Sequence, residues 1–310
     1  MKRFLLLGLC LLLVGCGIYR PNTTITEVNV HTGTKGITAK FLEQSPPAIT
    51  YANTPLSLSY ELANEGASDV TDGVVSIGIE DDFLKLEGDR IRLFKLDGRS
   101  TVNPQGESQI FSAQLRAKDL PPQTETATTT IALNVCDTYT TDAELTMCVD
   151  TDVFNRVRTK PCKSAAVSPG SQGAPVAVSK IEPTYTADAD PSRIRAAYLI
   201  TIRNAGSGQL FEADKSLEAC TPQALGKNSW NVASVKAFLG DQQLDCSPKK
   251  PNYGGSEGYL QLINGEDFVR CELPGGVPKT AGTYTSTMTV EVTYGYTFTL
   301  TKQVQIKRLT

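Results

Sequence analysis

The sequence predicts an all-β protein made of two tandem β-sandwich domains. Three observations support this prediction: apolar and polar residues alternate along many short segments, turn-forming residues separate these segments, and two parts of the chain repeat each other. The chain has 310 residues, a formal net charge of −3 and one histidine. This length suffices for two domains with cores of their own, and the weakly acidic balance disfavours nucleic acid as a partner.

The alternation is clearest near the C-terminus, where a threonine stands between most pairs of apolar residues. Apolar side chains at every second position would face a core and the threonines would face water, as in a half-buried strand. Gly295 interrupts this run, so we expect a turn or a bulge there, within a threonine-rich hairpin over 285–306. The other segments of this kind span 56–62, 74–79, 91–96, 110–115, 131–135, 194–202, 232–238 and 259–263.

An internal repeat predicts the number of domains. The stretch around Asn64 and Gly66 aligns with the stretch around Asn204 and Gly206, and a later stretch, 121–135, aligns with 278–292. The second alignment also suggests that Tyr139 corresponds to Tyr296. The alternative is that threonine-rich strands resemble one another without a duplication.

The domain boundaries follow from composition. Residues 164–173 are small, uncharged and rich in Pro and Gly, as in a linker. We therefore predict a signal peptide over 1–15, a tether over 16–34 with a short strand at 26–30, a first sandwich over 35–163 and a second sandwich over 174–310.

The first sixteen residues predict export. Lys2 and Arg3 precede an apolar run over 4–14, which is too short to cross a bilayer as a helix. The run ends Leu-Val-Gly-Cys at Cys16 and resembles the lipobox of prokaryotic lipoproteins. In that family the peptide is cleaved before the cysteine, which then carries the lipid, so the resemblance implies lipidation of Cys16 and an extracytoplasmic, membrane-anchored protein. The alternative is a secretion signal with an incidental cysteine.

Asn22 begins a possible N-glycosylation site in the tether.

An even number of cysteines after the predicted lipid site suggests disulfides in an exported chain. Two local pairs, Cys148 with Cys162 and Cys246 with Cys271, would leave Cys136 and Cys220 to connect the domains. Fifteen connectivities are possible for six cysteines, and one free cysteine in each domain is an alternative. No two cysteines have the close spacing of a structural zinc site, and we predict no metal site or cofactor.

Motifs for catalysis occur only without their structural context. Residues 254–258 match G-x-S-x-G, but no strand is predicted before them, a strand segment rather than a helix follows them, and the sole histidine, His31, lies in the tether. Ser247 and Lys250 match S-x-x-K, but Pro248 favours a turn. We therefore expect no catalytic residues.

Two groups of charged residues are candidates for binding. Carboxylates gather in predicted turns, as at Asp150 and Asp152, where calcium is an alternative to plain solvation. A basic run over 156–163 could touch anionic lipid or a wall polymer, although a solvated loop is the simpler interpretation.

The strand-turn segments ELANEG and TIRNAG, together with the closing VEVTYGYTFTLTKQVQI, resemble archaeal-type surface lipoproteins with immunoglobulin-like, cell-adhesion-related (CARDB-like) modules. The resemblance implies a non-catalytic binding, adhesion or scaffold protein with a protein or envelope polymer as its partner. A structural subunit of a cell-envelope assembly and an accessory subunit of an extracellular enzyme are the alternatives.

Overall fold

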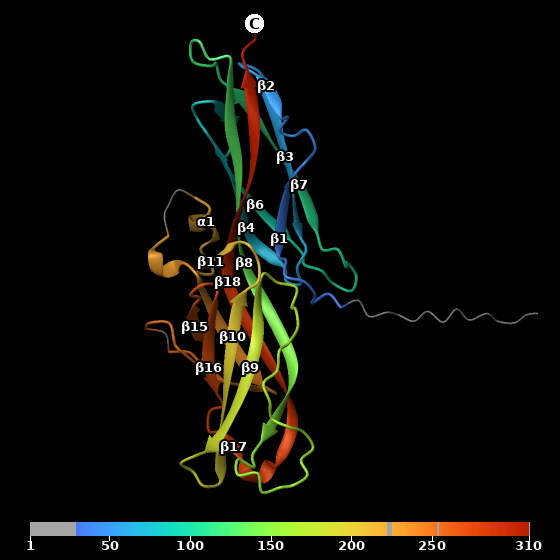
Figure 1. The fold of residues 1–310 in the computed structure, drawn as a ribbon, viewed down its shortest axis with the longest axis vertical. Helices are drawn as coiled ribbons and strands as arrows, with labels where there is room; N and C mark the ends of the chain where they lie inside the picture. Colours follow the sequence, from blue (N-terminus) through green and yellow to red (C-terminus); the bar gives the residue numbers. More distant parts are fainter. Residues whose placement is uncertain (1–28, 222–224, 253, 310) are drawn as a thin grey trace, which may run out of the picture.

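A computed structural model describes residues 29–221, 225–252 and 254–309. The prediction of an all-β sandwich fold is confirmed: among these residues nearly all regular structure is antiparallel strand, and the one α-helix, α1 (Ser216–Ala219), has a single turn. Figure 1 shows an elongated molecule in which two long strands run from one end to the other. The predicted signal peptide, Cys16, Asn22 and most of the tether strand over 26–30 lie outside the described residues.

Three sheets make up the fold. The first outer sheet contains, in spatial order, β1 (Ile37–Phe41), β3 (Pro55–Asn64), β7 (Ser108–Ala117) and β5 (Leu84–Glu87). The second outer sheet contains β14 (Asp245–Ser247), β16 (Glu266–Glu272), β10 (Arg193–Asn204), β17 (Val277–Pro278) and β9 (Val176–Ala187). The central sheet has the order β13 (Gln242–Gln243), β12 (Val232–Leu239), β18 (Thr283–Lys307), β8 (Thr126–Asp150), β4 (Val70–Ile79) and β6 (Ile91–Leu96), and β2 (Ile49–Tyr51), β11 (Gln209–Phe211) and β15 (Gly258–Gln261) pair with its members.

The two long strands of the central sheet join the halves of the molecule. Each has 25 residues, and they pair antiparallel along their whole length, from Thr283 opposite Asp150 to Lys307 opposite Thr126. In Figure 1 the first outer sheet lies beside the upper part of this pair and the second outer sheet beside the lower part. We call these parts the upper half and the lower half, and the region between them the waist.

The predicted domain boundaries stay a prediction, but this pairing shows that each half contains residues from both sides of the predicted linker. Residues 296–307 of β18 belong by sequence to the second domain, yet they pair with 126–137 of β8 and, at their end, with β2. Residues 138–150 of β8 belong by sequence to the first domain, yet they pair with 283–295. Each half therefore contains a strand segment from the other part of the chain, and the buried apolar residues form one main core.

The expected turn or bulge at Gly295 is wrong, and 285–306 is not a hairpin. Gly295 lies inside β18, opposite Thr138, and the strand continues through it without a break. A Cβ atom at this position would lie 2.2 Å from the ring of Phe211. The glycine is therefore required by the close approach of an aromatic ring rather than by a turn.

The Asn-x-Gly turn of the upper half is held by a buried network at the waist. The Asn64 side-chain amide donates to the backbone oxygen of Ser68 at 2.8 Å, and its carbonyl oxygen accepts from Gly66 N at 3.1 Å. The Ser68 backbone N–H in turn donates to the Tyr139 hydroxyl at 3.1 Å. This tyrosine belongs to β8 and is almost fully buried.

The lower half repeats this network residue for residue. Asn204 donates to Gly208 O at 2.9 Å and accepts from Gly206 N at 3.2 Å, while Gly208 N donates to the Tyr296 hydroxyl at 2.7 Å. The correspondence predicted between Tyr139 and Tyr296 is therefore confirmed by equivalent hydrogen bonds. Similar alternation alone does not produce such matched contacts, so the structure supports a true internal repeat.

The described residues contain three disulfides, Cys136–Cys220, Cys148–Cys162 and Cys246–Cys271. These are the two local pairs and the connecting pair put forward from the sequence. Disulfides form and persist in oxidising compartments, so they indicate a location outside the cytoplasm. Within the described residues, no helix has the length and apolar character needed to span a bilayer.

Candidate functional site

Three regions concentrate groups that stand out from an ordinary β-sandwich: a buried carboxyl at the waist, the surroundings of the Cys136–Cys220 disulfide, and an open sheet edge in the upper half. Each includes residues of β8 or β18, the two strands that extend through both halves.

The Asp137 carboxyl is buried at the waist. Its side chain is on the core face of β8, its residue is 1% exposed, and its Oδ1 has no hydrogen-bond partner among the described residues. Tyr296 lies directly opposite it on β18. Burial raises the pKa of Asp137 well above its usual value, and the nearby charge of Asp72 raises it further.

Replacing this carboxyl is expected to change how stability depends on pH. A native pKa above the unfolded value means that ionised Asp137 destabilises the fold at high pH, and that this cost declines as the pH falls toward about 4. We expect Asp137→Asn to raise the free energy of unfolding at pH 8, and the gain over the parent protein to shrink as the pH is lowered. Denaturant unfolding at several pH values measures this difference, with the exposed Asp89→Asn as the control. Parallel pH profiles for parent and Asp137→Asn would refute this role.

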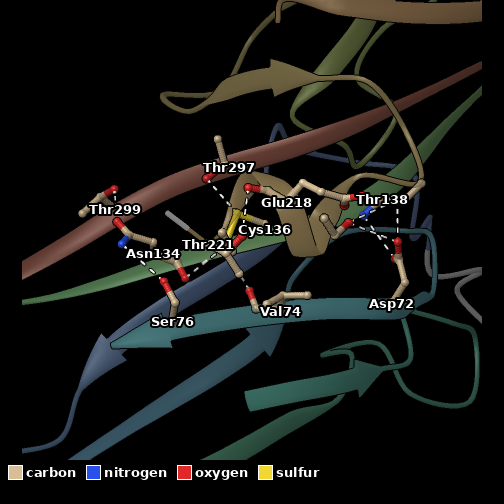
Figure 2. The surroundings of a disulfide bond; sticks show 12 residues. Asp72, Val74, Ser76, Asn134, Cys136, Thr138, Glu218, Thr221, Thr297 and Thr299 are labelled. Carbon is tan, nitrogen blue, oxygen red and sulfur yellow. Dashed lines mark hydrogen bonds between the residues drawn. A yellow bond between two sulfur atoms is a disulfide. The ribbon is translucent and has the colours of Figure 1, made fainter. Parts of the chain in front are cut away.

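The Cys136–Cys220 disulfide attaches α1 to the central sheet (Figure 2). Beside it, the Asp72 carboxylate of β4 accepts from the Thr138 hydroxyl at 2.6 Å and from the Ser216 hydroxyl at 3.1 Å. Asp72 of β4 therefore holds the start of the short helix, and Cys136 of β8 holds its end. This arrangement is structural: its polar groups are paired with one another, and no cluster of three or more metal-ligating side chains is found in the described part of the chain.

The open edge belongs to the upper part of β18. On the side away from β8, this strand pairs with β12 over 288–293, with β11 over 295–297 and with β2 over 305–307. Residues 298–304 have no strand partner on that side among the described residues. We call 298–304 the open edge.

Backbone direction shows which residues of the open edge can pair. Gln305 donates its backbone N–H to Ala48 O at 2.9 Å, away from β8. Since alternate residues of an antiparallel strand point their backbone groups to the same side, Thr299, Thr301 and Gln303 direct theirs toward the open side. An unpaired row of this kind can accept an added strand.

A groove of about 640 Å³ lies between the open edge and β1. Ile37 and Ala39 line it from β1, and Phe298 and Leu300 line it from β18. The last two side chains are only partly buried and pack against the main core. The groove therefore offers apolar contacts beside free backbone hydrogen-bonding groups, which is what an extended polypeptide requires.

The lower half shows a backbone contact at the strand edge that corresponds to β1. Ile37 begins β1 opposite Asn64, as Val176 begins β9 opposite Asn204, so the free edges of β1 and β9 correspond. Along the free edge of β9, Val167 exchanges two backbone hydrogen bonds with Ile181, at 2.9 and 2.8 Å.

The corresponding edge of β8 also differs in charge. If Tyr139 corresponds to Tyr296, Thr299 and Thr301 correspond to Asp142 and Glu144, both of which are exposed. Charged side chains along an edge discourage pairing with another strand. In the lower half the edge of β9 pairs with Val167 and the edge of β8 carries two carboxylates, whereas the open edge carries no carboxylate and one lysine, Lys302.

The other residues considered from the sequence have ordinary structural roles. Ser256 lies in the loop before β15, and its backbone oxygen accepts from Cys246 N at 2.9 Å. Asp150 and Asp152 lie 2.6 and 3.4 Å from the Lys160 ammonium, so this cation occupies the carboxylates considered for calcium. The Lys160 ammonium therefore supplies the positive charge that a calcium ion would supply at these two carboxylates.

Sequence reasoning missed the open edge and the buried carboxyl. Asp137 carries a readable signal, because it occupies a core-facing position in the alternation of β8. The open edge has no such signal in the sequence. The strands that flank β18 are short and distant in the chain, and their positions along β18 determine which part of it is left unpaired. Figure 1 shows β2 and β11 lying far apart along β18.

No protein-family model matches the chain, and no curated protein matches it. Among solved structures, the secreted serine protease VesC from Vibrio cholerae is similar over 84% of this chain and 50% of that chain, with 9% sequence identity and a TM-score of 0.20. The chain thus spans half the length of that protein. A TM-score this low establishes neither a shared fold nor a shared activity.

Proposed function

We propose that the protein is a non-catalytic, lipid-anchored, extracytoplasmic scaffold that binds an extended segment of a partner protein along the open edge of β18. The observation that carries this proposal is the run 298–304, which lies beside an apolar groove and has no strand partner on that side within the described part of the chain. The lower half supports the identity of the occupant, because Val167 of its own chain pairs there with the edge of β9, the strand that corresponds to β1 on the other side of the groove.

The absence of catalysis is part of the proposal. The G-x-S-x-G segment leads directly into β15, so its serine does not open a helix as in serine hydrolases. His31, the sole histidine, lies in the N-terminal segment near Asp142 rather than near Ser256. Binding by backbone pairing needs no reactive side chain, which agrees with this composition.

The anchor is proposed from the sequence around Cys16. Its test is independent of partner binding: mass spectrometry of the mature N-terminus should find a diacylglycerol-modified cysteine, and Cys16→Ser should release the protein from membranes. An unmodified N-terminus with unchanged fractionation would remove the anchor while leaving the open edge in place.

The open edge is tested by giving it the charges of its counterpart. Thr299→Asp/Thr301→Glu places two carboxylates on the exposed face of the edge, beside the side chains of an added strand, and charges along an edge oppose strand pairing, so we expect binding to weaken about tenfold. Lysine cross-linking on intact cells, followed by mass spectrometry, reads the outcome at Lys40 of β1 and at Lys302 of the open edge, whose ammonium lies over the Phe41 ring of β1. We expect cross-links to one partner species in the parent protein and their loss in the variant.

Thr299→Ser/Thr301→Ser is the matched control, because it adds no carboxylate to the edge and should retain the cross-links. Equal cross-linking in all three proteins would overturn the proposal.

A further inference from the structure

A loop at the far end of the lower half combines exposed apolar and basic side chains. The loop follows β8 over residues 151–163, includes Cys162 and lies at the bottom of Figure 1. Phe154 is 66% exposed and Val157 is 55% exposed. Arg156 and Arg158 are exposed between and beside them, and Lys163 is exposed just after the disulfide. We call these five residues the tip patch.

The loop is held in place, so the exposure of these side chains is built into the structure. The Cys148–Cys162 disulfide closes the loop on β8. Inside it, Lys160 donates to Asp150 at 2.6 Å and to Asn155 Oδ1 at 3.0 Å. Although burial alone would raise it, the pKa of Asp150 is held below its usual value by hydrogen bonds from Lys160 and Thr283, so the pair stays charged.

The remaining cations of the loop are free of carboxylates. Lys160 takes both acidic neighbours, and none of Arg156, Arg158 and Lys163 forms an ion pair within the described residues. The guanidinium of Arg156 lies over the Phe154 ring, 5.2 Å from its centre. An aromatic ring with flanking arginines is the arrangement that places an apolar group at the boundary of an anionic membrane.

The length of the N-terminal chain allows the loop to reach a bilayer that holds Cys16. The described chain starts near the waist, where Gly173 N donates to Gly33 O at 3.1 Å and Gly173 O lies 3.5 Å from the Tyr139 hydroxyl. From Cys16 to Asn29 the extended chain spans at most about 45 Å. From Tyr139 to the end of β8 at Asp150 the strand rises about 37 Å. The tip patch and a lipid on Cys16 can therefore meet the same surface.

We infer that the tip patch docks onto the anionic phospholipid surface of the membrane, with Phe154 and Val157 at the level of the headgroups and the three cations among the phosphates. Docking there directs the upper half and its open edge away from the bilayer. The chemistry of this contact does not depend on what the open edge binds.

The test uses the chain without its lipid (Cys16→Ser) and vesicles of phosphatidylcholine, alone or mixed equally with phosphatidylglycerol. We expect partition onto the mixed vesicles only. Arg156→Gln/Arg158→Gln should reduce it about 30-fold, because each cation near an anionic surface contributes about 1 kcal/mol. Lys85→Gln/Lys95→Gln, which removes two exposed lysines of the upper half, should leave the partition unchanged.

A second readout separates membrane docking from general attraction to polyanions. Phe154→Trp adds a fluorophore to a chain with only Trp230, and its emission should shift to shorter wavelength on mixed vesicles but not with soluble polyglutamate. No shift on vesicles would overturn the inference, as would equal losses in the two double variants. The same shift with polyglutamate would assign the patch to a soluble polymer and would also overturn it.

Discussion

Removing the Cys136–Cys220 disulfide is expected to lower the free energy of unfolding by about 4.5 kcal/mol. The two cysteines are 84 residues apart, and the chain-entropy model assigns a larger stabilisation to a longer closed loop. The bond also fixes α1 to the central sheet beside Asp72 and Thr138 (Figure 2). Denaturant unfolding of Cys136→Ala/Cys220→Ala under non-reducing conditions measures the loss.

The Cys148–Cys162 disulfide provides the comparison for this prediction. Its cysteines are 14 residues apart, so Cys148→Ala/Cys162→Ala should cost about 3 kcal/mol. A larger loss for the short loop than for the long one would contradict the role given to Cys136–Cys220 as the bond between distant parts of the chain.

Gly66→Ala is expected to destabilise the protein by about 3 kcal/mol, through overpacking at the waist. An added Cβ would lie 2.0 Å from the Tyr139 hydroxyl and 2.7 Å from the backbone oxygens of Gly173 and Lys35. Two of these three neighbours are backbone atoms, which cannot turn away as a side chain can. Thermal and denaturant unfolding both report the loss.

Gly206→Ala tests whether the repeat has the same requirement, since its Cβ would lie 2.2 Å from the Tyr296 hydroxyl. Gly226→Ala is the control: this residue has φ −58°, and nothing lies within 4 Å of the added atom. The control should stay within about 0.5 kcal/mol of the parent. Equal stabilities for Gly66→Ala and Gly226→Ala would show that the waist is not packed as described.

Local patterns in the sequence predicted much of the fold. Alternation identified the strand class because side chains of a half-buried strand must alternate between core and solvent. The Asn-x-Gly segments identified the repeat, and the structure gives the reason: Asn64 and Asn204 each bind the backbone of their own turn. Export and cysteine spacing together led to the disulfide pairs.

Long-range pairing could not be predicted in the same way. The continuity of β18 through Gly295 depends on a distant ring, Phe211, which fills the space that a side chain would take. The exchange of strand segments between the halves depends on the register of β8 with β18, which many threonine-rich alignments would satisfy. The open edge is a product of that exchange, so it appears only in three dimensions.

Site-specific photo-cross-linking in living cells tests most directly whether the open edge accepts a strand. A photoreactive residue would replace Thr299, Thr301 or Gln303 in turn, with Thr289, which pairs with Phe238 of β12, as the covered position. The account predicts cross-links from the three open positions to successive residues of one partner segment, and none from position 289. Cross-links spread over unrelated segments, or equally strong at position 289, would contradict strand addition.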